Sequence, residues 1–331
     1  MISRELPAPL QAAIDELVRA ADRSQLEAAA ARLTAAYRQG GVTRPARTRD
    51  EALAYVAQRA PATYAAAVAV LAELRALRPD WRPRSLLDVG AGPGTASWAA
   101  RAVWPELERF VLVEPEPEMI ALGRKLGPAD VEWVGADLDS AMGSFDLVLA
   151  GYVLNELPDE RVQRVAVSLW ARASDTLVAL EPGTPPGYGR VLAVRATVLA
   201  AGGFTLAPCP HDAECPLAAP DWCHFAVRLQ RSESHRAVKA VSRGFEDEKF
   251  SYVALTRESH PRAAARIIRA PQVRSGHVLI DLCGPAGVGR ATFSKRDREV
   301  YRRARKAAWG DVFDPVLREF DSADIETGEA P

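Results

Sequence analysis

Cysteine is scarce in this 331-residue chain: there are four, and they are unevenly distributed. Cys209, Cys215 and Cys223 fall within fifteen residues, and Cys283 lies far downstream. So low a content excludes a disulfide-dense secreted scaffold. In a reducing compartment structural disulfides are rare, so clustered cysteines more often indicate metal binding or redox chemistry.

The chain also lacks a run of eighteen apolar residues, a charged-then-apolar leader at Met1 and any internal repeat. We therefore expect a cytosolic protein with no membrane partner. Its net charge of -1 does not mark the whole molecule as a partner for polyanions. The length predicts two domains, or one large domain with an addition.

Helical periodicity in residues 1–80 predicts a helical cap, in which a second helix begins at Pro61. From residue 85 the pattern changes to short apolar runs about one strand–helix–strand unit apart. Five such runs alternate with helical patterns, which predicts an α/β fold with a doubly wound parallel sheet. The runs are "SLLDVG", "RFVLVEP", "VEWVGAD", "SFDLVLAGYVL" and "DTLVALEPG".

We divide the chain into five segments on these patterns. They are a helical N-terminal cap (1–80), a Rossmann-like core (81–203), a cysteine-rich insertion (204–248), the last sheet strands with a basic C-terminal segment (249–317) and an acidic tail (318–331). The later strands are clearest in "KFSYVALTR" and "GHVLIDLC". The tail has few large apolar residues, a composition typical of disorder.

A glycine-rich turn follows the first expected strand, in "LLDVGAGPGTASWAA". Asp88 precedes Gly90, Gly92 and Gly94 at the join between strand and helix. Glycines allow a tight turn and close approach of a ligand to the backbone. A dinucleotide-binding fold is one interpretation. However, the G-x-G-x-G spacing after an acid resembles motif I of class I methyltransferases that use S-adenosylmethionine.

Two further acids follow the next two expected strands. Glu114 ends the second strand, where an acid can accept hydrogen bonds from ribose hydroxyls, and Asp137 ends the third, where an acid can meet an adenine amino group. Each acid alone could be solvated in a loop. Because ligands of open α/β sheets bind at the carboxyl ends of strands, acids at three successive strand ends favour a nucleoside-binding site.

Catalytic residues are harder to identify in this sequence. After the fourth strand, "AGYVLNELP" lacks the Asx-Pro-Pro-aromatic motif that amino methyltransferases acting on bases often carry there. Asn155 and Glu156 could face the transferred methyl group, or they could cap the helix that follows. They are the catalytic candidates.

The cysteine spacing is C-x5-C-x7-C, with Cys283 after a further 59 residues. It matches neither a zinc ribbon nor the common ferredoxin patterns. Four thiolates nevertheless suit a tetrahedral zinc ion or an iron–sulfur cluster. His211 and His224 offer nitrogen ligands, which would favour zinc. Alternatively, the four cysteines are small buried hydrophobic residues.

The chain resembles the methyltransferase-like small-subunit ribosome-assembly family, which comprises mitoribosome assembly proteins and their bacterial relatives. The resemblance runs from "RAPATYAAAVAVL" to "RKAAWGDVF" and is most specific in "CPHDAECPL", "DWCHFAVRLQR" and "EDEKFSYVALTR". It implies that Cys209, Cys215, Cys223 and Cys283 hold a 4Fe-4S cluster. It also implies a small-ribosomal-subunit partner, in a family where some members act as assembly factors rather than as transferases.

Basic residues are concentrated late in the chain. Residues 290–306 hold eight basic residues against two acidic ones, with Tyr301 and Trp309 in or near this run. Such clusters contact phosphates without reading sequence, and basic runs with aromatics suit RNA. The alternative is a solvated helix face. The RNA-binding candidates are Lys295, Arg296, Arg298, Arg302, Arg303, Arg305 and Lys306.

The leading hypothesis is an iron–sulfur, S-adenosylmethionine-binding, methyltransferase-like protein. It would act on the rRNA of the small ribosomal subunit, by methylation, by assisting assembly, or by both. We expect a monomer that binds no DNA. One alternative is a catalytically inactive RNA-binding assembly factor, and another is a small-molecule methyltransferase with a structural zinc site.

Overall fold

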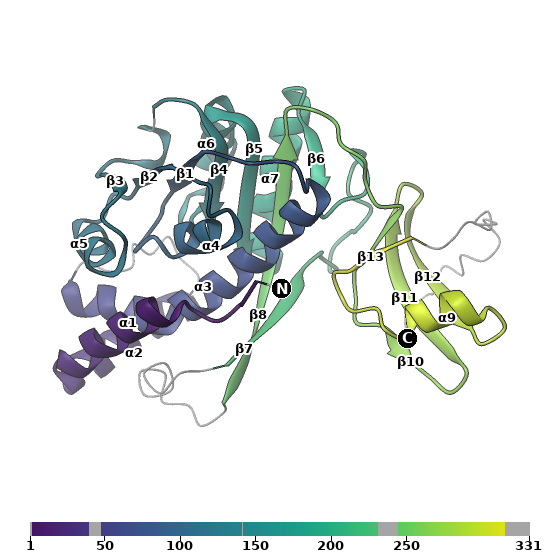
Figure 1. The fold of residues 1–331 in the computed structure, drawn as a ribbon, viewed down its shortest axis with the longest axis horizontal. Helices are drawn as coiled ribbons and strands as arrows, with labels where there is room; N and C mark the ends of the chain where they lie inside the picture. Colours follow the sequence, from purple (N-terminus) through teal and green to yellow (C-terminus); the bar gives the residue numbers. More distant parts are fainter. Residues whose placement is uncertain (1, 40–47, 141, 231–243, 315–331) are drawn as a thin grey trace.

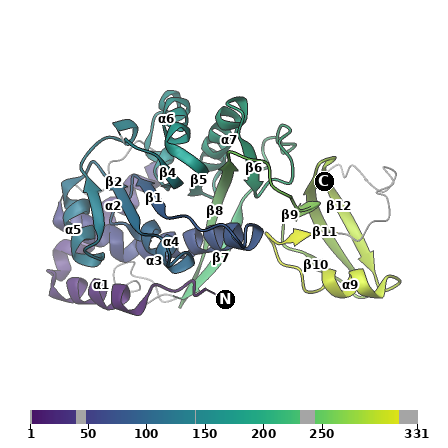
Figure 2. The same cartoon turned by 45° about the horizontal axis from the view of Figure 1, so that its top comes forward.

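The computed structural model describes residues 2–39, 48–140, 142–230 and 244–314. The acidic tail expected at 318–331 lies outside these ranges. A large mixed sheet lies between two layers of helices, and a smaller sheet with one helix lies beside it (Figures 1 and 2). An α/β fold is therefore confirmed.

The elements follow one another as expected for strands that alternate with helices. The helices are α1 (Ala8–Ala20), α2 (Arg23–Gln39), α3 (Arg49–Leu77), α4 (Thr95–Val103), α5 (Pro117–Leu126), α6 (Asp159–Arg172), α7 (Pro185–Ala200) and α9 (Arg298–Ala304), with 3-10 turns η1 (Leu138–Ser140) and η2 (Leu154–Glu156). The large sheet contains β1 (Ser85–Val89), β2 (Arg109–Val113), β3 (Val131–Val134), β4 (Phe145–Gly151), β5 (Ala173–Pro182), β6 (Phe204–Ala207), β7 (Phe225–Gln230) and β8 (Phe245–Thr256). The small sheet contains β9 (Ala265–Ile267), β10 (Gln272–Val273), β11 (His277–Gly284), β12 (Gly287–Ser294) and β13 (Val312–Phe313).

The strand order of the large sheet is β3-β2-β1-β4-β5-β8-β6. β1 to β5 are parallel to one another, and the order 3-2-1-4-5 is that of doubly wound nucleotide-binding folds. β8 runs antiparallel to β5 and to β6. The strand order reverses between β1 and β4, which is where ligands bind in such sheets.

Both faces of this sheet are buried. In β4, Leu147 and Leu149 join the core formed with α3 and α4, whereas Val148 and Ala150 join the core formed with α6 and α7. Side chains alternate along a strand, so a strand covered on both sides needs apolar residues at successive positions. This explains why the sequence shows continuous apolar runs instead of alternation.

The helix α3 is continuous from Arg49, so the prediction of a helix that begins at Pro61 is wrong. Thr48 caps this helix by accepting the backbone N–H of Glu51, and acids in the first turn favour the positive end of the helix dipole. A proline within a helix removes one backbone hydrogen bond. Here Pro61 is buried among alanines that favour helix, and packing keeps the helix intact.

By length and composition α3 could also cross a membrane, because its mean hydropathy reaches 1.3. However, 61% of the apolar window is buried inside the molecule, where α3 packs on α2, α4 and the sheet. Its apolar character is therefore explained by internal packing. The expectation of no membrane partner stays a prediction.

The small sheet has the order β10-β11-β9-β13, and β12 pairs with β11. Of the late strands expected to complete the large sheet, only β8 does so. β11 and β12 instead form a hairpin, and α9 covers its apolar face through Val300 and Ala304. The late strands thus have a core of their own.

The cysteine-bearing segment begins and ends on one edge of β8. β6 and β7 pair with successive parts of this edge, and the segment 208–224 leaves the sheet between them. The expected insertion at 204–248 therefore contributes two strands to the large sheet as well as a loop. The segment boundaries themselves stay predictions.

Gly123 of α5 tests the packing of the glycine turn against β3. A Cβ atom at this position would lie 2.4 Å from the Trp133 ring and 3.1 Å from the Pro93 carbonyl oxygen. We expect Gly123→Ala to lower the free energy of unfolding by about 1–3 kcal/mol through overpacking. Chemical denaturation measures this change.

Gly189 of α7 is the matched control, because a Cβ atom there would meet nothing within 4 Å. We expect Gly189→Ala to be neutral or to stabilise by about 0.4–1 kcal/mol. Equal losses in the two variants would contradict the packing shown around Gly123.

Candidate cofactor cavity and cysteine cavity

A cavity of about 250 Å³ lies at the carboxyl ends of β1 to β4. It is the place expected from the reversal of strand order. Several side chains in its lining come from α3 and from the turn after β4. Of the residues predicted for the cofactor or for catalysis, it is lined by Asp88, Gly90, Gly92, Glu114, Asp137 and Glu156.

The glycine turn has a positive φ at each of its three glycines. At Gly90 a Cβ atom would lie 2.1 Å from the Val153 side chain, so a larger residue cannot fit against the turn that follows β4. At Gly92 no atom lies within 4 Å of a Cβ position, so the backbone is open to a ligand. This is the close approach that the sequence pattern predicted.

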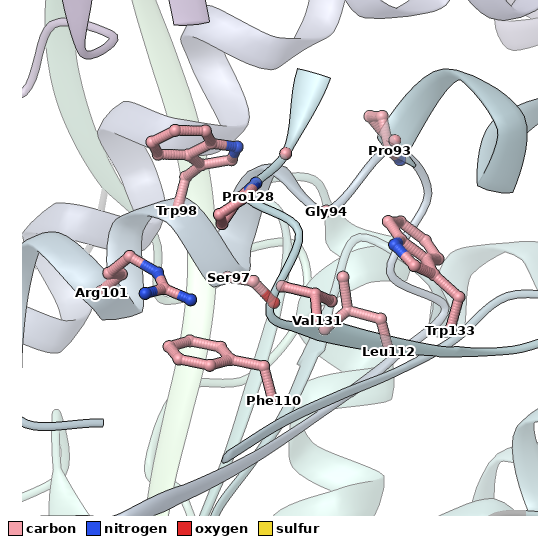
Figure 3. Close-up of a pocket in the computed structure, with 12 residues that line it drawn as sticks. Pro93, Gly94, Ser97, Trp98, Arg101, Phe110, Leu112, Pro128, Val131 and Trp133 are labelled. Atoms are coloured by element: carbon pink, nitrogen blue, oxygen red, sulfur yellow. The ribbon is translucent and has the colours of Figure 1, made fainter. Parts of the chain in front are cut away.

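Gly94 does not line the cavity, in contrast to the other residues predicted to bind the cofactor. With φ at +82° it is the N-cap of α4, and it lines a narrow second pocket between α4, α5 and β3. In that pocket the Trp133 ring lies near Pro93, and the Arg101 guanidinium lies 4.1 Å from the centroid of the Phe110 ring (Figure 3). Gly94 therefore contributes to the conformation of the turn without facing the cofactor cavity.

Asp88 ties the turn to α4. It is 1% exposed, and its carboxylate accepts a hydrogen bond from Ser97 Oγ at 2.8 Å. Burial raises the pKa of Asp88 to about 7, although the bond from Ser97 opposes this rise, and the nearby charge of Glu114 adds to it. Asp88 consequently changes its protonation state near neutral pH.

Glu114 holds the turn from the neighbouring strand. Its Oε2 accepts the N–H of Gly92 at 2.8 Å, and its Oε1 accepts the N–H of Glu116 at 2.9 Å. Burial raises the pKa of Glu114, and these two backbone bonds oppose the rise. Each oxygen keeps a second lone pair, so the carboxylate can still accept hydroxyl donors.

Asp137 lies at the far side of the cavity, after β3. Its Oδ1 accepts the N–H of Leu138 at 2.8 Å, and its Oδ2 pairs with Arg161 at 3.1 Å. Both residues line the cavity, so the ion pair orients the Asp137 carboxylate within its lining.

The two catalytic candidates lie differently. Glu156 lines the cavity, but Asn155 donates from Nδ2 to the Tyr152 carbonyl at 2.9 Å and to the Glu181 carboxylate at 3.0 Å. Neither caps α6, which begins after Pro158 without a side-chain cap. Asn155 therefore orders the turn after β4, and of these two only Glu156 can meet a ligand in the cavity.

Sequence reasoning missed a buried polar cluster beside the cavity. Tyr152 lines the cavity and donates to Glu248 Oε1 at 3.1 Å, and Arg59 pairs with the same oxygen at 2.9 Å. Tyr152 has a φ of 60°, a strained conformation for a bulky residue that costs about 1–3 kcal/mol. The sequence did contain one sign of this site: Tyr152 directly follows β4, and ligands bind at the carboxyl ends of such strands.

The four cysteines converge on a separate cavity, of about 30 Å³, between the large and small sheets. Cys283 faces it from β11, and the other three come from the 208–224 segment. Tyr188 Oη lies 3.0 Å from Cys215 Sγ. The alternative of four unrelated buried cysteines is thus disfavoured, because residues far apart in the sequence meet at one cavity.

The histidines are not equivalent. His211 Nε2 lies 3.8 Å from Cys283 Sγ, whereas His224 is stacked on Trp222, meets Trp309 edge-on and is outside the cavity lining. A contact with a cysteine sulfur is therefore shown for His211.

Two buried arginines also line the cysteine cavity. Arg195 is 5% exposed and Arg266 is 4% exposed. Burial raises the pKa of the Cys209, Cys223 and Cys283 thiols, to about 12 for Cys283, and the charges of neighbouring sulfur atoms add to this rise. The positive charges of Arg195 and Arg266 oppose the rise at Cys209 and Cys283. The sequence signal for Arg195 was a lone charge within the apolar run "VLAVRATVLA" of α7.

The donor set fits a thiophilic metal group, but a metal site is not shown. Over the ranges that the structure covers, no three His, Cys, Asp or Glu side chains are arranged to hold one metal ion. Sulfur ligands of a single zinc ion lie about 3.8 Å apart, because each Zn–S bond is about 2.3 Å. The soft donors and the buried positive charges around the cavity are compatible with a larger group.

The seven residues predicted to bind RNA are all exposed, on or beside α9. None of them forms an ion pair with another residue in the described part of the chain. Arg303 donates to the Asp314 carbonyl and lies over the Phe313 ring. Their positive charge is therefore available at the surface of the small sheet.

The strand order, the glycine turn after β1 and the acids at the next strand ends define a class I methyltransferase fold. A family model described as "Mitochondrial small ribosomal subunit Rsm22" matches residues 49–314, and the chain belongs to this family. The family resemblance read from the sequence is thereby confirmed.

Curated relatives include the human "Ribosome assembly protein METTL17, mitochondrial", which is 30% identical over 300 residues. The match covers 82% of this chain and 64% of the human protein. The "Rsm22-cox11 tandem protein 2, mitochondrial" of Schizosaccharomyces pombe is 28% identical, over 80% of this chain and 43% of that protein. The chain thus spans about two thirds or less of the relatives' length.

These names contradict the expected cytosolic location, since the family and its relatives are described as mitochondrial. The expectation rested on a default for chains without an evident leader, which is no positive sign of location.

Solved structures with a similar fold include the Synechocystis magnesium protoporphyrin IX methyltransferase with bound S-adenosylmethionine. It is 11% identical with a TM-score of 0.41, over 64% of this chain and 85% of that one. A precorrin-6y methyltransferase from Geobacter metallireducens is 17% identical with a TM-score of 0.39, over 58% and 86% of the two chains. The assignment of the fold rests on strand order rather than on these likenesses.

The pH dependence of stability tests whether the Asp88 carboxyl beside the glycine turn has a raised pKa in the folded protein. A carboxyl whose pKa rises from 3.8 to about 7 on folding binds more protons folded than unfolded between these values, so its contribution to stability falls as pH rises through this window. We expect Asp88→Asn to remove this dependence, at about 1.4 kcal/mol per pH unit. Denaturation at pH 5 and pH 7 measures it.

The variant's loss of stability between pH 5 and pH 7 should be smaller than that of the unmodified protein by about 2 kcal/mol. If the free energy of unfolding changed equally with pH in the variant and in the unmodified protein, Asp88 would be ionised throughout this range in the folded protein.

Proposed function

We propose that the cavity at the carboxyl ends of β1 to β4 binds S-adenosylmethionine. The observation that carries the proposal is the set of acids around the open glycine turn: Asp88, Glu114, Asp137 and Glu156 line one cavity. A cofactor with a pyrophosphate would meet like charges there, whereas S-adenosylmethionine has no phosphate and carries a positive sulfonium. Glu114 would accept the ribose hydroxyls, and Asp137 would meet the adenine amino group.

We further propose that the protein acts on the small ribosomal subunit and its rRNA. The family description names a small ribosomal subunit protein, and the human relative is named as a ribosome assembly protein. The exposed basic residues around α9 supply phosphate contacts of the sequence-independent kind. rRNA methylation and assembly without methyl transfer are the two forms of this function.

In the methylating form, the cavity would hold S-adenosylmethionine so that a nitrogen or carbon of a base could bond to its methyl carbon. The bond from that carbon to the sulfonium sulfur would break, S-adenosylhomocysteine would leave and the base would lose a proton, and the protein would contribute by positioning. Among the residues that directly follow β4 and line the cavity, Glu156 and Tyr152 have polar side chains that could face such a base. In the other form, the cofactor cavity would serve binding alone.

The third part of the proposal is a metal centre held by Cys209, Cys215, Cys223 and Cys283. Their convergence on one cavity supports it, and a 4Fe-4S cluster takes four thiolates. Such a group would hold the small sheet to the large one and order the 208–224 segment.

Cofactor binding is tested by titration calorimetry with S-adenosylmethionine. We expect Glu114→Ala to weaken binding at least tenfold, since its loss frees Gly92 and removes the acceptor for the ribose. Glu108→Ala is the control, because Glu108 is an exposed acid beside the opposite end of β2 that pairs with Arg84. Equal affinities in the two variants would contradict the assignment of Glu114.

The same proteins are then incubated with labelled cofactor and isolated small subunits. Label in rRNA that is lost in Glu114→Ala establishes methylation. Absence of label, together with rRNA binding that weakens with salt, would overturn methylation and leave assembly without transfer as the function. Absence of both would overturn the ribosomal function.

The metal centre is tested by anaerobic purification with absorption spectroscopy and iron and zinc analysis. We expect iron and a broad visible absorption, which each Cys→Ser change should reduce strongly because each thiolate is a ligand. His224→Gln is the control, since His224 lies outside the cavity lining. A colourless protein with one zinc would replace the cluster, and full iron retention in Cys283→Ser would remove Cys283 as a ligand.

A further inference from the structure

The side chain of Arg195 lies in the cysteine cavity with an incomplete set of partners. It projects from α7, and its Nη2 donates to the carbonyls of His211 and Ala213 at 2.8 Å each. Its Nε is buried and has no hydrogen-bond partner. In the part of the chain that the structure describes, no carboxylate forms an ion pair with Arg195.

A second buried arginine, Arg266, and the partly buried Arg59 differ in this respect. Arg266, which lines the same cavity, pairs with Glu73 at 2.5 Å. Arg59 pairs with Glu248 at 2.9 Å. A buried guanidinium without a counter-charge is costly, so arginine is rarely buried unless it is paired.

The sulfur atoms are the groups that can supply the missing negative charge. Arg195 lines the cavity with all four cysteines, and no carboxylate is among the described residues that line it. Four thiolates carry more negative charge than a divalent ion or an iron–sulfur core neutralises. A metal group with four thiolate ligands is therefore an anion that needs a positive neighbour.

We propose that Arg195 is the counter-ion of the metal–thiolate group in this cavity and tunes its charge. The proposal rests on the metal centre proposed above. Arg195 acts in two ways: its charge stabilises the anionic group, and its Nη2 bonds hold the carbonyls of the segment between Cys209 and Cys215. It is a positioning residue, and the metal ligands remain the cysteines.

The charge has a defined consequence for an iron–sulfur group. Reduction adds an electron and makes the group more negative, so a nearby positive charge favours the reduced form. Removal of that charge makes the reduction potential more negative and weakens retention of the metal.

The test compares Arg195→Met, Arg195→Lys and the control Arg190→Met in the full-length protein. Arg190 lies on the same helix but pairs with Asp159 and does not line the cysteine cavity. For Arg195→Met we expect a more negative potential by redox titration, and at least tenfold faster loss of metal to a chelator. Arg195→Lys keeps the charge and should stay close to the unmodified protein in potential, and Arg190→Met should leave both readouts unchanged.

The outcomes separate this inference from the proposed metal centre. An unmodified protein without iron or zinc overturns the metal centre itself. A loaded Arg195→Met protein with unchanged potential and unchanged metal loss overturns the role of Arg195 alone. If Arg195→Met does not fold, Arg195→Gln replaces it as the uncharged variant, and the same two readouts decide.

Discussion

The pairing of β8 is the constraint on which both candidate sites depend. This strand runs antiparallel between β5 on one side and β6 and β7 on the other, which fixes its register along its whole length. Its first half brings Glu248 to Tyr152 at the cofactor cavity. Further along, Ser251 Oγ donates to the carbonyl of Cys223 at 2.8 Å. The two cavities are thus built on one rigid element, and a shift of β8 by one residue would move both.

Buried polar contacts set the orientation of the small sheet relative to the large sheet. Arg266 of β9 pairs with Glu73 of α3 and donates to the carbonyls of Pro208 and Gly310, so it joins the small sheet, α3 and the cysteine segment. Tyr252 donates to the same Glu73 at 2.6 Å. Breaking a buried pair costs about 3–5 kcal/mol because the remaining charge has no partner, although a well-packed apolar replacement can be as stable. Their role here is to specify one arrangement of the two sheets.

The sequence predicted correctly those features in which a local pattern corresponds to a local structure. Continuous apolar runs corresponded to doubly covered strands, and the acids at their ends reached one cavity as Asp88, Glu114 and Asp137. It failed where the outcome depends on what packs nearby. Pro61 looks like a helix start, but it lies within a buried helix. Asn155 looks like a catalytic group, but Glu181 of the adjacent strand holds it away from the cavity.

By itself, the sequence determined the doubly wound order of strands and helices, the glycine turn and the four thiols as a group of soft donors, because periodicity, glycine and cysteine chemistry are properties of the chain. Tertiary structure decided that the late strands form a separate sheet, and that Cys283 meets the other cysteines across two sheets. It also decided that Arg195 is buried among them, with no acid paired to it in the described part of the chain. These outcomes come from long-range pairing and desolvation, which no short stretch of sequence specifies.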